Sequence, residues 1–168
     1  MRKTVAVCVL MALIASASAE VTRVAVPDSN WSVSFESPPL QSDPVGPSAR
    51  NLLYRGRADR LNVSLHVGPP ECPGANTNQE MYRCFGARLD RLKGVVPESI
   101  TAAETPRGVE LGYLLRVRDG DRSVALFNMH LLFAKKGSWG DLHVSMVQPQ
   151  AGDVPVVTGI IRSVSIAE

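Results

Sequence analysis

The sequence lacks several features that would place it in a familiar functional class. It has no run of Lys or Arg residues, and after Ala15 it has no second long apolar segment. The first absence argues against a nucleic-acid or anionic-lipid surface. The second argues against a membrane-spanning helix in the rest of the chain. Aromatic residues make up only 5% of the sequence, within an otherwise ordinary globular composition.

The N-terminus has the pattern of a cleaved secretory signal. Arg2 and Lys3 precede a short apolar run, and Ala17-Ser18-Ala19 follows it. This predicts a signal peptide over residues 1–19, with cleavage between Ala19 and Glu20, and a periplasmic or secreted bacterial protein. Residues 20–168 then form a single domain with no membrane span. Cleavage removes two of the 18 basic residues and none of the 16 acidic ones, so the charges of the mature chain balance.

The cysteine pattern is sparse and lacks the C-x-x-C spacing of redox pairs and zinc sites. Cys8 lies inside the predicted signal, which leaves Cys72 and Cys84 in the mature chain. In an exported protein such a pair predicts a structural disulfide. The bridge would fasten the Pro- and Gly-containing loop before the first helix, and in the chain-entropy model it contributes on the order of 3 kcal/mol.

Hydrophobic periodicity predicts an α+β fold, an antiparallel sheet covered by two helices. Thr77 and Glu80 form a capping box, so a helix should run to about Lys93, with Gly94 ending it. A second helix opens near Asp153. Alternating segments predict strands at 21–26, 31–36, 51–58, 60–67, 99–103, 109–117 and 123–134, with a return strand after Gly137 and a short one at 163–166.

The last hairpin can be given a register. Gly137-Ser138 suits the two central positions of a type II′ turn, with glycine first. Counting outward then pairs apolar residues on one face: Phe133 with Leu142, Leu131 with Val144, and Met129 with Met146. On the other face this register sets His130 opposite Ser145, with His143 diagonal to His130.

This order of elements resembles the Mog1/PsbP-like superfamily. The resemblance rests on the early "WSVSFESPP" strand, the central helix, the meander from Val109 to Gln148 and the closing "VVTGIIRSVSI". It implies an α/β/α sandwich around an antiparallel sheet. It also implies a small accessory or binding protein without enzymatic activity, and it brings no catalytic residues with it.

All three histidines of the protein fall in or near the predicted sheet. If His66 shares the face of His130 and His143, three imidazoles cluster there and could bind zinc or copper. A hydrolytic arrangement of Ser145, His130 and Asp141 is the weaker alternative, because the sequence has no G-x-S-x-G elbow. The plainer interpretation is a partly solvated polar face with no catalytic residue.

Three function hypotheses remain open. The first is an exported, non-enzymatic binding or accessory protein of the bacterial envelope with an unknown protein partner, possible contacts being Trp139 at a hairpin tip beside Lys135 and Lys136. Trp139 could equally pack back over its own hairpin. The second is a periplasmic metal-binding or hydrolytic protein that uses the His130 and His143 face. The third is a small-molecule or lipid carrier with a cavity between sheet and helix.

Overall fold

The computed structural model describes residues 18–46, 49–72 and 76–168. The predicted signal peptide therefore lies outside the described residues, except for its last two positions. The first strand begins at Glu20, directly after the predicted cleavage site.

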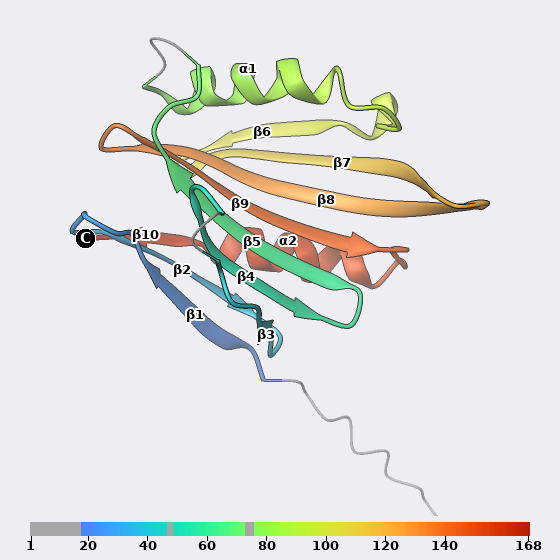
Figure 1. The fold of residues 1–168 in the computed structure, drawn as a ribbon, viewed down its shortest axis with the longest axis horizontal. Coiled ribbons are helices and arrows are strands. Elements are labelled where there is room, and N and C mark those ends of the chain that lie inside the picture. Colours follow the sequence, from blue (N-terminus) through green and yellow to red (C-terminus); the bar gives the residue numbers. More distant parts are fainter. Residues whose placement is uncertain (1–17, 47–48, 73–75) are drawn as a thin grey trace, which may run out of the picture.

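Two antiparallel sheets and two helices make up the fold (Figure 1). The small sheet has the order β1-β2-β10, and its strands are β1 (Glu20–Ala25), β2 (Ser32–Ser37) and β10 (Ser165–Ala167). The large sheet has the order β3-β4-β5-β9-β8-β7-β6. Its strands are β3 (Gln41–Ser42), β4 (Leu52–Ala58), β5 (Leu61–Gly68), β6 (Thr101–Thr105), β7 (Gly108–Asp119), β8 (Arg122–Lys135) and β9 (Ser138–Val147).

The helices lie on opposite faces of the large sheet. Helix α1 (Asn78–Leu89) contacts β7 and β8, whereas α2 (Asp153–Ser163) contacts β8 and β9 on the other face and also β2 of the small sheet (Figure 1). A one-turn 3-10 helix, η1 (Pro97–Ser99), connects α1 to β6. The predicted antiparallel sheet with two covering helices is confirmed. The small sheet adds a separate layer beneath α2.

The main apolar core fills the space between the large sheet, α2 and the small sheet. Strict alternation along β5 and β9 turns one side of each strand toward this core, because successive side chains on a strand point to opposite faces. Its fully buried members come from both sheets and from α2: Val33, Phe35, Val63, Leu65, Leu131, Phe133, Leu142, Val144 and Ile161. A second, smaller cluster lies under α1.

Helix α1 begins where the capping box predicts and ends earlier than expected. The Thr77 hydroxyl accepts from the Glu80 backbone N–H at 3.2 Å, and the Glu80 carboxylate accepts from the Thr77 N–H at 2.9 Å. The last helical residue is Leu89, and Leu92, within the range predicted to be helical, lies beyond it and is 45% exposed. Gly94 has a different role: at φ 93° it passes so close to β7 that a Cβ would collide with the Arg116 carbonyl.

The register of the β8–β9 hairpin differs from the expected one by two residues. Lys136 and Gly137 occupy the turn with φ of 50° and 77°, the pair of positive values that a type I′ turn requires. Lys135 therefore pairs with Ser138, Leu131 with Leu142, and His130 with His143. A shift of two preserves the alternation, so the predicted faces are right and the predicted partners are wrong.

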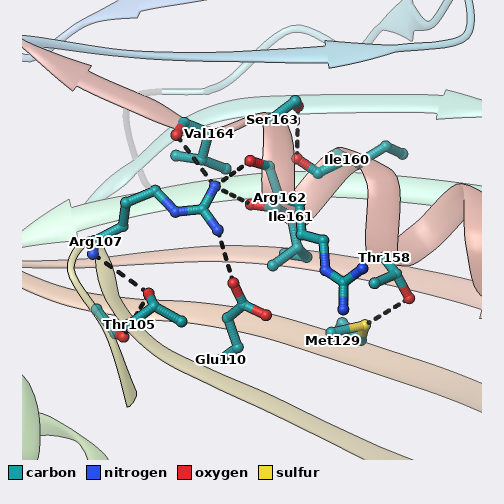
Figure 2. Close-up of polar contacts among 11 residues, drawn as sticks. Thr105, Arg107, Glu110, Met129, Thr158, Ile160, Ile161, Arg162, Ser163 and Val164 are labelled. Atoms are coloured by element: carbon teal, nitrogen blue, oxygen red, sulfur yellow. Dashed lines mark hydrogen bonds and ion pairs between the residues drawn. The ribbon is translucent and has the colours of Figure 1, made fainter. Parts of the chain in front are cut away.

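Arg107, in the β6–β7 turn, holds the C-terminus of α2 against the sheet (Figure 2). Its Nη1 donates to the carbonyl oxygens of Ile161 at 3.3 Å and Val164 at 3.4 Å, and also to that of Arg162. Its Nη2 donates to the Glu110 carboxylate at 2.8 Å. The last carbonyls of a helix have no partner within the helix and carry partial negative charge, so one guanidinium satisfies several of them.

This arrangement predicts that Arg107→Met lowers the free energy of unfolding by about 1–3 kcal/mol, because hydrogen bonds from a charged donor are lost while the apolar stem is kept. Urea unfolding measures the change. Arg118→Met, which alters an exposed arginine of β7, is the matched control and should change the midpoint little. Equal effects of the two substitutions would show that the contacts to α2 contribute nothing.

Candidate functional site

A polar face lies on the α1 side of the large sheet. Strand pairing aligns three cross-strand rows on β5, β9 and β8: Asn62 with Ser145 and Asn128, Ser64 with His143 and His130, and His66 with Asp141 and Leu132. Directly paired residues share a face, so the polar positions of these strands lie together. They share it because the intervening residues are the apolar ones that form the main core.

Coverage by α1 divides this face. The helix packs mainly on β7 and β8, so burial falls from β8 toward β4. His130 is 4% exposed, His143 is half-buried and His66 is exposed. Further out, Arg55 and Arg57 of β4 pair with Ser64 and Asn62 and are also exposed. We call the outer part, residues Arg55, Arg57, Asn62, Ser64, His66 and Ser145, the open face.

The buried part centres on His130. Its Nδ1 lies 2.9 Å from Asp141 Oδ1, and its Nε2 lies 3.3 Å from the Tyr113 hydroxyl. Burial, and then the Asp141 charge, raise the pKa of Tyr113 to about 12, so this hydroxyl keeps its proton at neutral pH. Burial alone would raise the pKa of Asp141. The charge of His130 and its hydrogen bond outweigh burial, so the pKa of Asp141 lies below its ordinary value.

His143 stacks directly on His130. The ring centroids are 4.2 Å apart with an interplanar angle of 4°, and the Phe85 ring packs on His130 with a centroid distance of 4.7 Å. His143 Nε2 lies 3.0 Å from Asn128 Oδ1, which fixes its ring. Burial, and then the neighbouring His130 charge, lower the pKa of His143 to about 3. The imidazole of His143 is therefore neutral at neutral pH.

This geometry gives the metal hypothesis no support. Imidazole lone pairs lie in the ring plane, so two stacked rings direct them side by side instead of toward one point. Both ring nitrogens of His130 already have protein partners, and His66 lies on the outer strand of the row with Asp141. Among the described residues no group of three or more His, Cys, Asp or Glu side chains is placed to hold a metal ion.

The hydrolytic alternative fails on the same register. Ser145 pairs with Asn128, not with His130 as expected, and the His130 nitrogen that would activate a nucleophile faces Tyr113. An orienting carboxylate and an imidazole are present, but the hydroxyl bonded to that imidazole in the described part of the chain is the buried phenol of Tyr113. The pair is better understood as a satisfied buried polar network.

Trp139 is not an exposed anchor. It is 7% exposed, pairs with Ala134 and packs in the apolar cluster under α1 with Met81 and Cys84. The contact surface expected at this hairpin tip therefore does not include Trp139. Lys136 remains exposed and forms an ion pair with Glu168 at 2.9 Å, and Lys135 is half-buried.

The disulfide expected from the sequence is present. Cys72 and Cys84 are bridged, with their Cα atoms 6.2 Å apart. The bridge ties the segment after β5 to the middle of α1. Beside it lies a cavity of about 240 Å³ between α1, the end of β5 and the start of β9.

Two residues of this cavity, Arg50 and Asn51, come from the segment before β4 and escaped the sequence analysis. Asn51 has φ of 64°, its carbonyl accepts from the Val67 N–H at 2.7 Å, and its side chain occupies the space above Gly68. Asparagine is enriched at such positive φ values, and this preference is the only feature of the sequence that could have drawn attention to Asn51. Only the tertiary structure brings this segment beside His66 and Asp141.

These features define a PsbP-like α+β fold. Over 94% of this chain and 98% of the other, the structure is similar to the solution structure of cyanobacterial PsbP (CyanoP) from Synechocystis sp. PCC 6803, with a TM-score of 0.57 and 13% sequence identity. The likeness confirms the fold that the order of elements predicts and concerns the fold alone. No protein-family model and no curated protein matches the sequence. No helix in the described part of the chain is long and apolar enough to cross a membrane.

The shifted pKa of His143 predicts a pH dependence of stability. A histidine with a lower pKa in the folded state binds fewer protons there than in the unfolded chain, so the free energy of unfolding falls as pH falls from 6.5 toward 3. His143→Gln, which can still donate to Asn128, should flatten this decline between pH 6.5 and about 4.5. Asp141 contributes only at lower pH, since its pKa lies below 3.8.

Urea unfolding at several pH values measures the difference between the two proteins. His66→Gln, at an exposed position of the same face, serves as the control and should keep the wild-type slope. A wild-type slope in His143→Gln would contradict the assigned burial of a neutral imidazole.

Proposed function

We propose that this chain is an exported, non-enzymatic binding or accessory protein of the bacterial envelope, and that the open face is the surface that contacts its protein partner. The observation that carries the proposal is the incomplete coverage of the large sheet. α1 packs mainly on β7 and β8, and Arg55 and Arg57 of β4 and Asn62 and His66 of β5 stay exposed. Arginine is enriched at protein interfaces, and the open face contains Arg55 and Arg57.

The chemistry of the site supports a binding role over a catalytic one. In the one carboxylate–imidazole pair among the residues described above, the His130 ring is buried against Tyr113 and Phe85 and is 4% exposed. Binding proteins need a rigid surface more than a reactive group, and the open face sits on paired strands. The PsbP-like fold supports this role as well, because accessory and binding proteins use it.

Export is supported by two independent features. The N-terminal pattern predicts cleavage after Ala19, and the first strand starts at Glu20, so cleavage would leave β1 intact. The Cys72–Cys84 bridge suits an oxidising compartment, because disulfides persist there and are rare in the cytosol.

Export therefore predicts a defined N-terminus and thiol content for the protein. The protein recovered from the envelope or medium should begin at Glu20 and contain no free thiol, because Cys8 leaves with the signal and the other two cysteines are bridged. Intact-mass analysis before and after reduction with thiol alkylation measures both properties. A retained leader, or two thiols that react without reduction, would contradict export.

Partner contact predicts position-specific cross-linking. A photo-reactive residue at Asn62, in the middle of the open face, should give a discrete adduct in intact cells. The same residue at Val21, which is 69% exposed on the small sheet, should give none. Arg55→Glu should weaken the Asn62 adduct, because it reverses a charge beside that position. Identical adducts from both positions, or no adduct from Asn62, would refute the proposed surface.

A further inference from the structure

The cavity beside the disulfide adjoins the open face at His66, which belongs to both, and its lining combines charged and apolar side chains. Its volume of about 240 Å³ falls just below the range of roughly 300–1,000 Å³ that holds drug-sized ligands. It is therefore suited to a small molecule. A lipid chain would need a larger and more uniformly apolar space.

The lining of the cavity includes the carboxylate of Asp141. This side chain is 19% exposed. One oxygen, Oδ1, is bonded to His130 Nδ1. An ionised carboxylate has about four acceptor positions. Asp141 can therefore accept from a ligand donor without losing its internal partner, and its lowered pKa keeps it charged.

Guanidinium groups line the same cavity. Arg50 is exposed, and Arg88 comes from α1 and forms an ion pair with Glu71. Since Glu71 already balances Arg88, Arg50 is the cation that has most to offer a ligand anion. Guanidinium matches the geometry of a carboxylate well.

An apolar wall completes the lining. Met81 and Phe85 of α1 and Trp139 of β9 face the cavity together with the bridged Cys84. The helix supplies these residues at positions 81, 84, 85 and 88, which is one stripe of an α-helix. The disulfide anchors the neighbouring segment at this stripe, so the wall is held in place.

We propose that this cavity binds a small zwitterion, of the size of a free amino acid with an apolar side chain. Its ammonium group bonds to Asp141, its carboxylate meets Arg50, and its side chain lies against Met81 and Phe85. A plain anion would be repelled by Asp141, and a plain cation would be repelled by Arg50. A zwitterion has an ammonium group for Asp141 and a carboxylate for Arg50.

Calorimetry on the exported chain with its disulfide intact tests this assignment. The probes are L-phenylalanine, phenethylamine, which lacks the carboxylate, and 3-phenylpropionate, which lacks the ammonium group. L-Phenylalanine should bind, and each of the other two should bind at least about tenfold more weakly, because each loses one charged hydrogen bond. No heat of binding for L-phenylalanine up to about 10 mM, or equal affinity for all three, would overturn the proposal.

Substitutions of Arg50 and Asp141 test the contact of each residue with the ligand separately. Arg50→Gln should weaken L-phenylalanine binding about tenfold and leave phenethylamine binding no weaker. Asp141→Asn should weaken L-phenylalanine and leave 3-phenylpropionate no weaker. Arg118→Gln, an exposed arginine outside both the cavity lining and the open face, is the control and should leave binding of all three probes unchanged. If Asp141→Asn fails to fold, the Arg50 variant and the probe series still decide the outcome.

This result is distinguishable from that of the partner experiment. Arg50→Gln should keep the Asn62 cross-link, because Arg50 lies outside the open face. Loss of ligand binding with an intact adduct would therefore separate the cavity from the partner surface. An equal loss of affinity for phenethylamine in Arg50→Gln would show that Arg50 does not meet the ligand carboxylate.

Discussion

The pairing of β8 with β9 is the constraint on which the arrangement of the site depends. The Lys136–Gly137 turn, with positive φ at both residues, aligns His130 with His143 across the hairpin. The same alignment brings Asp141 diagonally within hydrogen-bonding distance of His130 and carries Trp139 beneath α1. On the opposite face it covers Gly140 with the ring of Phe133, where a Cβ would collide. One turn geometry therefore sets both the polar network and part of the core.

The network under α1 places polar side chains at buried positions that apolar side chains could have filled. Burying imidazole, carboxylate, amide and phenol groups costs free energy unless they are hydrogen-bonded. Here these groups are hydrogen-bonded to one another: His130 bonds to Asp141 and Tyr113, and His143 bonds to Asn128. Trp139 Nε1 is the one buried side-chain nitrogen or oxygen in the described part of the chain without a partner. A satisfied network of this kind rigidifies the sheet and keeps the adjoining face polar.

The molecule is consequently two-sided. On one side, α2 and the small sheet seal an apolar core, and Arg107 fastens the end of α2 to the β6–β7 turn. On the other side, α1 covers mainly β7 and β8, and the disulfide anchors the segment that leads into it. The sealed side supplies stability, while the partly covered side retains exposed polar groups and a cavity. A binding function fits this division, because recognition needs exposed residues that are not buried in the core.

Local patterns alone determined much of this protein. Period-two alternation assigned the faces of β5, β8 and β9, the Thr77–Glu80 box started α1, and the two mature cysteines indicated the bridge. The tertiary structure decided which residues meet. A two-residue slip of a hairpin leaves alternation unchanged, so hydrophobicity could not distinguish His143 from Ser145 as the partner of His130, and only the turn dihedrals did. The burial of Trp139 and the presence of Arg50 and Asp141 in one cavity likewise depend on contacts between segments distant in sequence, which no local pattern encodes.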